Sequence, residues 1–122
     1  MANVQELDKA IAAHSMWKSH LRTAIDKKEL HVSVAVIRDD RQCAFGQWLY
    51  GGSLTAQDRA SANFKTVSEL HAQFHVETAK IADMALKGKK AEAEALMASN
   101  SDYSALSAKL TASMMAWKKV SK

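Results

Sequence analysis

Proline is absent from the sequence, and glycine occurs only four times in 122 residues. Proline interrupts helices because it lacks a backbone N–H and clashes with the preceding turn, so this composition permits long uninterrupted helices. Abundant alanine, leucine, lysine and methionine favour helices as well. No apolar run approaches the roughly 20 residues of a membrane span, and the charged residues that soon follow Asn3 show no secretory signal. We therefore expect a helical cytoplasmic protein with no membrane partner.

Cysteine is nearly absent too. Cys43 is the single one, so no disulfide can form within the chain, and a lone reduced thiol is typical of a cytoplasmic protein. The 48% hydrophobic and 25% charged residues are globular values. The length fits one domain, which we expect to span residues 1–122.

The net charge of +4 raises the hypothesis of a nucleic-acid partner. Basic residues are interspersed with acidic ones, except in the segments 87–90 and 118–119. Neither segment alternates with the aromatic residues that stack on bases. Lysines at such places more often complement the dipole at helix ends. We therefore expect no nucleic-acid partner.

Apolar periodicity predicts four helical stretches and one connector. The stretches cover residues 4–28, 43–50, 55–86 and 89 to the end. Thr55 is the expected N-cap of the third, and Gly88 is expected to end it. Short loops between long amphipathic helices favour antiparallel neighbours. The expected fold is all-α, an antiparallel four-helix bundle with an additional short helix that carries Cys43.

The connector, residues 30–37, is rich in β-branched residues and on its own suggests a strand. A single strand would have no partner in an otherwise helical chain. We therefore expect an extended or irregularly helical segment packed on the bundle. The short helix that follows should end at Gly51 and Gly52.

Three histidines lie on the expected inward faces of the helices. His71 and His75 are one turn apart on one helix, and His14 lies on the apolar side of the first. They could be ordinary core histidines bonded to carbonyls or waters. Together with Cys43, however, they form a complete tetrahedral ligand set for zinc, in which one cation uses one nitrogen of each ring. Outside this set, His20 and His31 are predicted to be surface or connector residues.

A closed ligand set leaves no position for a water nucleophile, which favours holding or sensing a metal over hydrolysis. The His-Glu-x-x-His motif of zinc peptidases is missing, because Ala72 follows His71. No orienting group or oxyanion pocket can be identified for Cys43 as a nucleophile. We expect no catalytic residues and no enzyme activity. Asp40 is either an outer partner that orients an imidazole or a solvated turn residue.

The order of these motifs resembles the chemoreceptor zinc-binding (CZB) domain family over nearly the whole chain. The pattern is His14-x-x-Trp17, then 25 residues, Cys43-x-Phe45-Gly46-x-Trp48, then 22 residues, and His71-x-x-x-His75. The resemblance implies that His14, Cys43, His71 and His75 bind Zn²⁺, and that Trp17, Phe45, Gly46 and Trp48 pack around the site.

The family resemblance also implies a function. Family members are bacterial cytoplasmic modules of chemoreceptors or diguanylate cyclases, linked to sensing of zinc and of oxidants such as hypochlorous acid. The chain carries neither a receptor signalling hairpin nor a cyclase domain, so it would act on such a protein in cis or in trans. Oxidation of Cys43 would weaken one metal bond and release the short helix.

Two classes of function remain open at this point. One is a zinc-dependent regulatory domain that responds to zinc level or to oxidation. The other is a zinc-stapled structural module for docking or dimerisation. Family modules are commonly dimeric, and the apolar residues Met16, Val32, Val34 and Val36 either form a two-fold interface or pack internally.

Overall fold

The computed structural model describes residues 4–29, 33–52, 54–98 and 100–120, which form eight helices and no strand. The all-helical prediction is confirmed. The helices are α1 (Val4–Ser15), α2 (Trp17–Lys27), α3 (Val34–Arg38), α4 (Ala44–Tyr50), α5 (Ala56–Arg59), α6 (Ala62–Leu86), α7 (Lys90–Leu96) and α8 (Asp102–Val120). None of these helices is long and apolar enough to cross a membrane.

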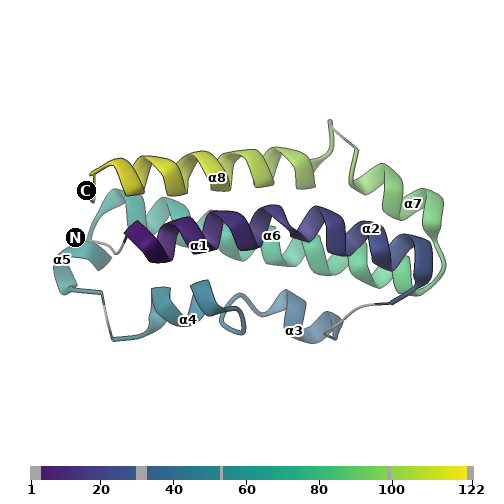
Figure 1. The fold of residues 1–122 in the computed structure, drawn as a ribbon, viewed down its shortest axis with the longest axis horizontal. Coiled ribbons are helices and arrows are strands. Elements are labelled where there is room, and N and C mark those ends of the chain that lie inside the picture. Colours follow the sequence, from purple (N-terminus) through teal and green to yellow (C-terminus); the bar gives the residue numbers. More distant parts are fainter. Residues whose placement is uncertain (1–3, 30–32, 53, 99, 121–122) are drawn as a thin grey trace.

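Figure 1 shows the helices as elongated segments lying side by side. α1 and α2 follow one another along the molecule, α3 and α4 lead back along one side, and α6 runs the full length again. α7 and α8 return to the end from which α1 starts. Helix α6 packs against α2, α3 and α8, while α1 packs against α4 and α8. The long central helix α6 is thus in contact with most of the others.

Three of the four predicted helical stretches prove to be interrupted, whereas the stretch 43–50 forms the continuous helix α4. A break at Met16 separates α1 from α2, and another between Leu96 and Asp102 separates α7 from α8. Thr55 is an N-cap with a capping box, as expected, but it caps only α5. A second cap follows immediately, because the Ser61 side chain accepts a hydrogen bond from the N–H of Phe64 and starts α6. The prediction of a continuous helix over 55–86 is therefore wrong at its first turn.

The connector is helical where the structure describes it. Residues 34–38 form α3, and Ser33 caps this helix by accepting a hydrogen bond from Val36 N–H. The extended alternative is wrong for these residues, and residues 30–32 lie outside the described part. Ile37 is buried in the core, and α3 packs on α6. Tertiary packing and a local cap here outweigh the β-propensity of the valines.

Two stop signals act as predicted. Gly88 adopts a left-handed conformation with φ of 80° just after α6 ends, which a residue with a Cβ would adopt only with strain. Helix α4 ends at Tyr50, directly before Gly51 and Gly52. The second stop sets the length of the short helix that follows Cys43.

The core is apolar apart from a small group of buried polar side chains. Among the large core residues are Leu7, Leu21, Leu49, Phe74 and Met114. The buried polar side chains are His14, Asp58, His71, His75 and Thr78. Buried polar groups require partners, so the three histidines mark the part of the core that packing alone does not explain.

Candidate metal centre

Three helices bring the predicted ligand residues to one place. His14 lies in the last turn of α1, Cys43 is the N-cap of α4, and His71 and His75 are one turn apart on α6. One ligand atom from each of the four lies within 4.8 Å of all the others. The fold thus assembles a sulfur and three nitrogens from positions far apart in the sequence.

Four of the six distances between the ligand atoms are close to those of a tetrahedral site. The Nε2 atom of His71 lies 3.0 Å from Nε2 of His14 and 3.0 Å from Nε2 of His75. The Sγ atom of Cys43 lies 3.3 Å and 3.5 Å from Nε2 of His71 and His75. Tetrahedral zinc with Zn–N of about 2.0 Å and Zn–S of about 2.3 Å would separate two nitrogens by about 3.3 Å and nitrogen from sulfur by about 3.5 Å.

The outer ring nitrogens explain which atoms face inward. Nδ1 of His14 lies 2.7 Å from the carbonyl of Ala10, and Nδ1 of His75 lies 2.7 Å from the carbonyl of Ile37. A carbonyl can only accept, so each Nδ1 carries the proton and each Nε2 presents a lone pair. If these were ordinary core histidines, their bonds to carbonyls would account for the Nδ1 atoms alone. A cation would in addition satisfy the Nε2 atoms, all at once.

His71 differs from the other two histidines. Its ring is fully buried, and its Nδ1 has no hydrogen-bond partner among the described residues. Oδ2 of Asp40 lies 3.8 Å from this atom. An Nδ1–H facing a carboxylate is the arrangement of an outer-shell partner of a metal-bound imidazole. Asp40 therefore lies near His71 but beyond hydrogen-bond distance, and its role as an outer partner stays a prediction.

Burial keeps the three imidazoles neutral. Desolvation lowers the pKa of His14 to about 4, although its bond to Ala10 acts in the opposite direction. Desolvation, with smaller contributions from His14 and His75, lowers the pKa of His71 to about 2. The pKa of His75 is lowered by burial too. Neutral imidazoles are the form that binds a metal.

Cys43 is half-buried, and burial raises the pKa of its thiol. Two features of α4 act the other way. Sγ accepts a hydrogen bond from the N–H of Gly46 at 3.3 Å, which lowers this pKa. The N-terminus of a helix also favours negative charge. A cation at the site would add to both effects and hold the sulfur as thiolate.

Gly46 is the position in α4 that tolerates no side chain. A Cβ built there would overlap the carbonyl oxygen of Asp40. The close approach lets the loop before Cys43 turn tightly over the first turn of α4. The expectation that Gly46 packs at the site is thereby supported by geometry.

Aromatic rings enclose the histidines. Phe45 makes edge contacts with His14 and His71, with ring centroids 5.8 and 5.1 Å apart. Trp48 stacks on Phe45 at 5.5 Å and so lies one layer further out. Trp17 lies against His20 at 5.3 Å, and its packing at the site stays a prediction. The carbonyls of Ala10 and Ile37 carry no signal in sequence, because every residue has one.

His20 is separate from the cluster. His20 lies in α2, is partly exposed, and contributes no atom to the group of four. His31 falls outside the residues that the structure describes. The prediction that His20 lacks the inward placement is consistent with this position.

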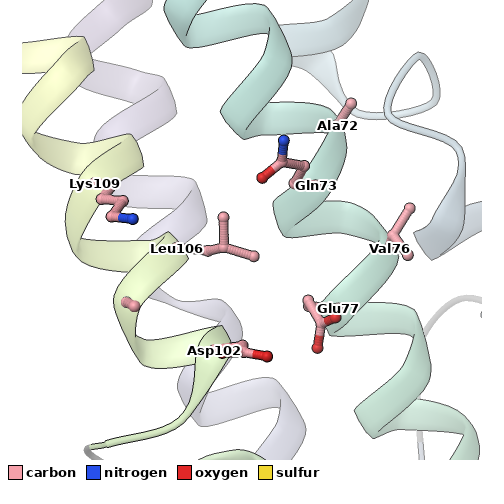
Figure 2. Close-up of a pocket in the computed structure, with 8 residues that line it drawn as sticks. Ala72, Gln73, Val76, Glu77, Asp102, Leu106 and Lys109 are labelled. Carbon is pink, nitrogen blue, oxygen red and sulfur yellow. The ribbon is translucent and has the colours of Figure 1, made fainter.

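A groove of about 510 Å³ lies on the other side of α6, between α6 and α8. Figure 2 shows Leu106 of α8 pointing toward α6, with the carboxylates of Glu77 and Asp102 near one another. None of the four cluster residues lines it. The lining residues are Ala72, Gln73, Val76, Glu77, Asp102, Ala105, Leu106 and Lys109.

Fold and site together define a helical metal-binding domain with one sulfur and three nitrogens poised around one position. Comparison with family models identifies the chemoreceptor zinc-binding domain over residues 14–82, which is more than half of the chain. The chain belongs to this family, and zinc is its metal. No curated protein and no solved structure matches the chain.

Proposed function

We propose that His14, Cys43, His71 and His75 are the four ligands of one zinc ion. The observation that carries this proposal is the approach of their ligand atoms to within 4.8 Å of one another. The bonds from Nδ1 of His14 and His75 to carbonyls support it further, because they leave both Nε2 atoms free to bind. With four protein ligands, the site has no open position, so we propose a role without catalysis.

The zinc site belongs to one domain spanning residues 1–122, in an antiparallel four-helix arrangement. The four segments of this arrangement are α1–α2, α3–α4, α6 and α7–α8. The short helix that carries the cysteine motif is α4. Zinc would join α1, α4 and α6, so its binding would stabilise their packing directly. Structural zinc sites contribute on the order of 10 kcal/mol of apparent binding free energy.

The domain would act as a sensor of zinc level or of oxidation at Cys43. Cys43 is the one soft, oxidisable ligand, and the residues just before it, 41 and 42, are exposed. With hypochlorous acid, the thiolate sulfur donates an electron pair to form sulfenic acid, and chloride leaves. The weakened fourth metal bond would then release α4. Release of this short helix would change the surface of the domain that a partner meets.

The protein regulated by the domain would be a bacterial cytoplasmic chemoreceptor or diguanylate cyclase. The domain would act on it in cis or in trans. The family description, a chemoreceptor zinc-binding domain, supports the first of these two partners. A homodimer would use the apolar side chains exposed near the break between α1 and α2 and on α3. Met16 is 54% exposed and Val36 is 39% exposed.

A structural role, with zinc as a staple for a docking or dimerisation module, is the second candidate. The complete burial of His71 favours the structural role, since zinc held by a fully buried side chain exchanges slowly with solvent. Both candidates bind zinc, so affinity does not separate them. A conformational response at α4 to oxidation or chelation, with the rest of the fold intact, would support the sensor.

The ligand assignment is tested by metal analysis and X-ray absorption on protein purified without added metal. We expect one zinc per chain, with one sulfur near about 2.3 Å and three nitrogens near about 2.0 Å. Metal-free protein that takes up no added zinc, or a site with oxygen ligands alone, would contradict the proposal.

A further inference from the structure

Asp40 lies between the metal centre and a tyrosine at the end of α4. The hydroxyl of Tyr50 donates a hydrogen bond to Oδ2 of Asp40 at 2.7 Å. The same Oδ2 lies 3.8 Å from Nδ1 of His71. One carboxylate oxygen is therefore held by a phenol on one side and faces a buried imidazole on the other.

Only His71 has this environment. The Nδ1 atoms of His14 and His75 are already bonded to backbone carbonyls at 2.7 Å, whereas the buried Nδ1 of His71 has no hydrogen-bond partner in the described part of the chain. An unsatisfied buried N–H is destabilising. A shift of less than about 1 Å would bring Asp40 into hydrogen-bond range. A carboxylate accepts more strongly than a carbonyl, so this bond would make His71 the most basic of the three imidazoles.

The backbone of Asp40 packs against the first turn of α4, which begins at Cys43. Its carbonyl oxygen lies against Gly46, where a Cβ would overlap it, and 3.7 Å from Sγ of Cys43. Tyr50 is in the last turn of α4, and the guanidinium of Arg41 lies over its ring at 5.3 Å. Burial and the bond to Asp40 raise the pKa of Tyr50 to about 12, so its hydroxyl stays a donor. The carboxylate and the thiol thus move with one short helix.

We propose that Asp40 is a positioning residue, which accepts the Nδ1–H of His71 when zinc is bound, and that Tyr50 holds its carboxylate in place. This inference rests on the proposed zinc ligation by His71. Through Asp40 the buried centre is connected to the side chain of Tyr50, which is 40% exposed. A contact that draws Tyr50 away from Asp40 therefore lowers the affinity for zinc. Zinc affinity then depends on the surface of α4.

The first test compares three variants by competition with a zinc chelator. Asp40→Asn keeps the shape and removes the charge, and should weaken zinc binding by about 10–100-fold, the usual effect of losing an outer partner. Tyr50→Phe removes one hydroxyl and should weaken it by a smaller factor. Asp39→Asn is the matched control. The side chain of Asp39 is exposed and accepts hydrogen bonds from Arg41 N–H and the Gln42 amide. Its charge acts only weakly on His75, so this change should reduce zinc affinity far less than Asp40→Asn does.

A second readout separates positioning from general support of the fold. In zinc-loaded protein, long-range ¹H–¹⁵N NMR detects the three Nδ1–H groups. Asp40→Asn should move the His71 proton upfield while those of His14 and His75, bonded to carbonyls, keep their positions. Tyr50→Phe should move the His71 proton in the same direction by less, and it serves where the Asn variant folds poorly.

Each outcome decides a different proposal. Parent protein that takes up no zinc would overturn both the proposed function and this inference. Parent protein that binds zinc, with unchanged affinity and an unchanged His71 proton in both variants, would overturn this inference alone. Equal movement of all three protons would do the same, since it would mean that Asp40 supports the loop and not His71.

Discussion

The Nε2 atoms of His14 and His71 lie 3.0 Å apart although 57 positions separate the two residues in the chain. Nδ1 of His14 is bonded to a carbonyl, so its Nε2 points a lone pair at the neighbouring ring. His75 directs its own lone pair to the same place. A close group of lone pairs is unfavourable by itself and becomes favourable when a cation lies between them.

The ligands should differ sharply from the other histidines. Loss of an outer partner weakens metal binding by up to about 100-fold. We expect His71→Ala to weaken zinc binding by more than this, since it removes a ligand nitrogen itself. Cys43→Ser should also weaken it, because a hydroxyl replaces the thiolate. His20→Ala is the matched control and should bind like the parent. Similar losses in all three variants, measured by chelator competition, would contradict the ligand assignment.

Gly46 should be sensitive to the smallest added side chain. Gly46→Ala introduces a Cβ that overlaps the Asp40 carbonyl, and overpacking of this kind costs about 1–3 kcal/mol. The loop would move together with Cys43, so zinc affinity should fall as well. Gly52→Ala is the control, because its Cβ would meet no atom within 4 Å. Chemical denaturation of the zinc-loaded variants measures the difference, and equal stability of the two would show that the loop yields without cost.

Zinc binding should release about one proton per chain at pH 7. The lowered pKa values of the three histidines leave them neutral there, so they have no proton to lose. Burial raises the pKa of the Cys43 thiol, which therefore holds its proton until the metal displaces it. Because the pKa of His14 is about 4 and that of His71 about 2, these two residues should release no additional proton at pH 6.

This proton count is measured by titration calorimetry in buffers of different ionisation enthalpy. Release of three or four protons would be incompatible with buried, neutral histidines in the zinc-free protein. The experiment needs no variant, so it reports on the native site directly.

Oxidation should loosen α4 before it loosens α6. After mild treatment with hypochlorous acid, we expect hydrogen exchange to rise around Phe45 and Trp48, because α4 has seven residues and is anchored partly through Cys43. Helix α6 has 25 residues and buries nine side chains, so its amides should stay protected. Uniform exchange along the chain would indicate oxidative unfolding. Unchanged exchange would favour the structural staple.

Much of the metal centre could be predicted from the sequence because it depends on side-chain type and on local periodicity. The spacing of His71 and His75 on one helix, and the inward position of His14, follow from the 3.6-residue repeat. Caps and stops such as Thr55 and Gly88 are local signals too, and both act at the expected positions, although Thr55 caps only the short helix α5. The sequence by itself thus determined the helical class and the four side chains that converge.

The tertiary structure decided what surrounds those side chains. Helix breaks such as the one at Met16, and the helical state of residues 34–38, depend on how neighbouring helices pack, which local propensity does not encode. The acceptors for His14 and His75 are backbone carbonyls, which every residue possesses. The link from Tyr50 through Asp40 toward His71 joins two elements that meet only in the folded chain. Contacts between distant segments arise from packing, and packing is a property of the whole fold.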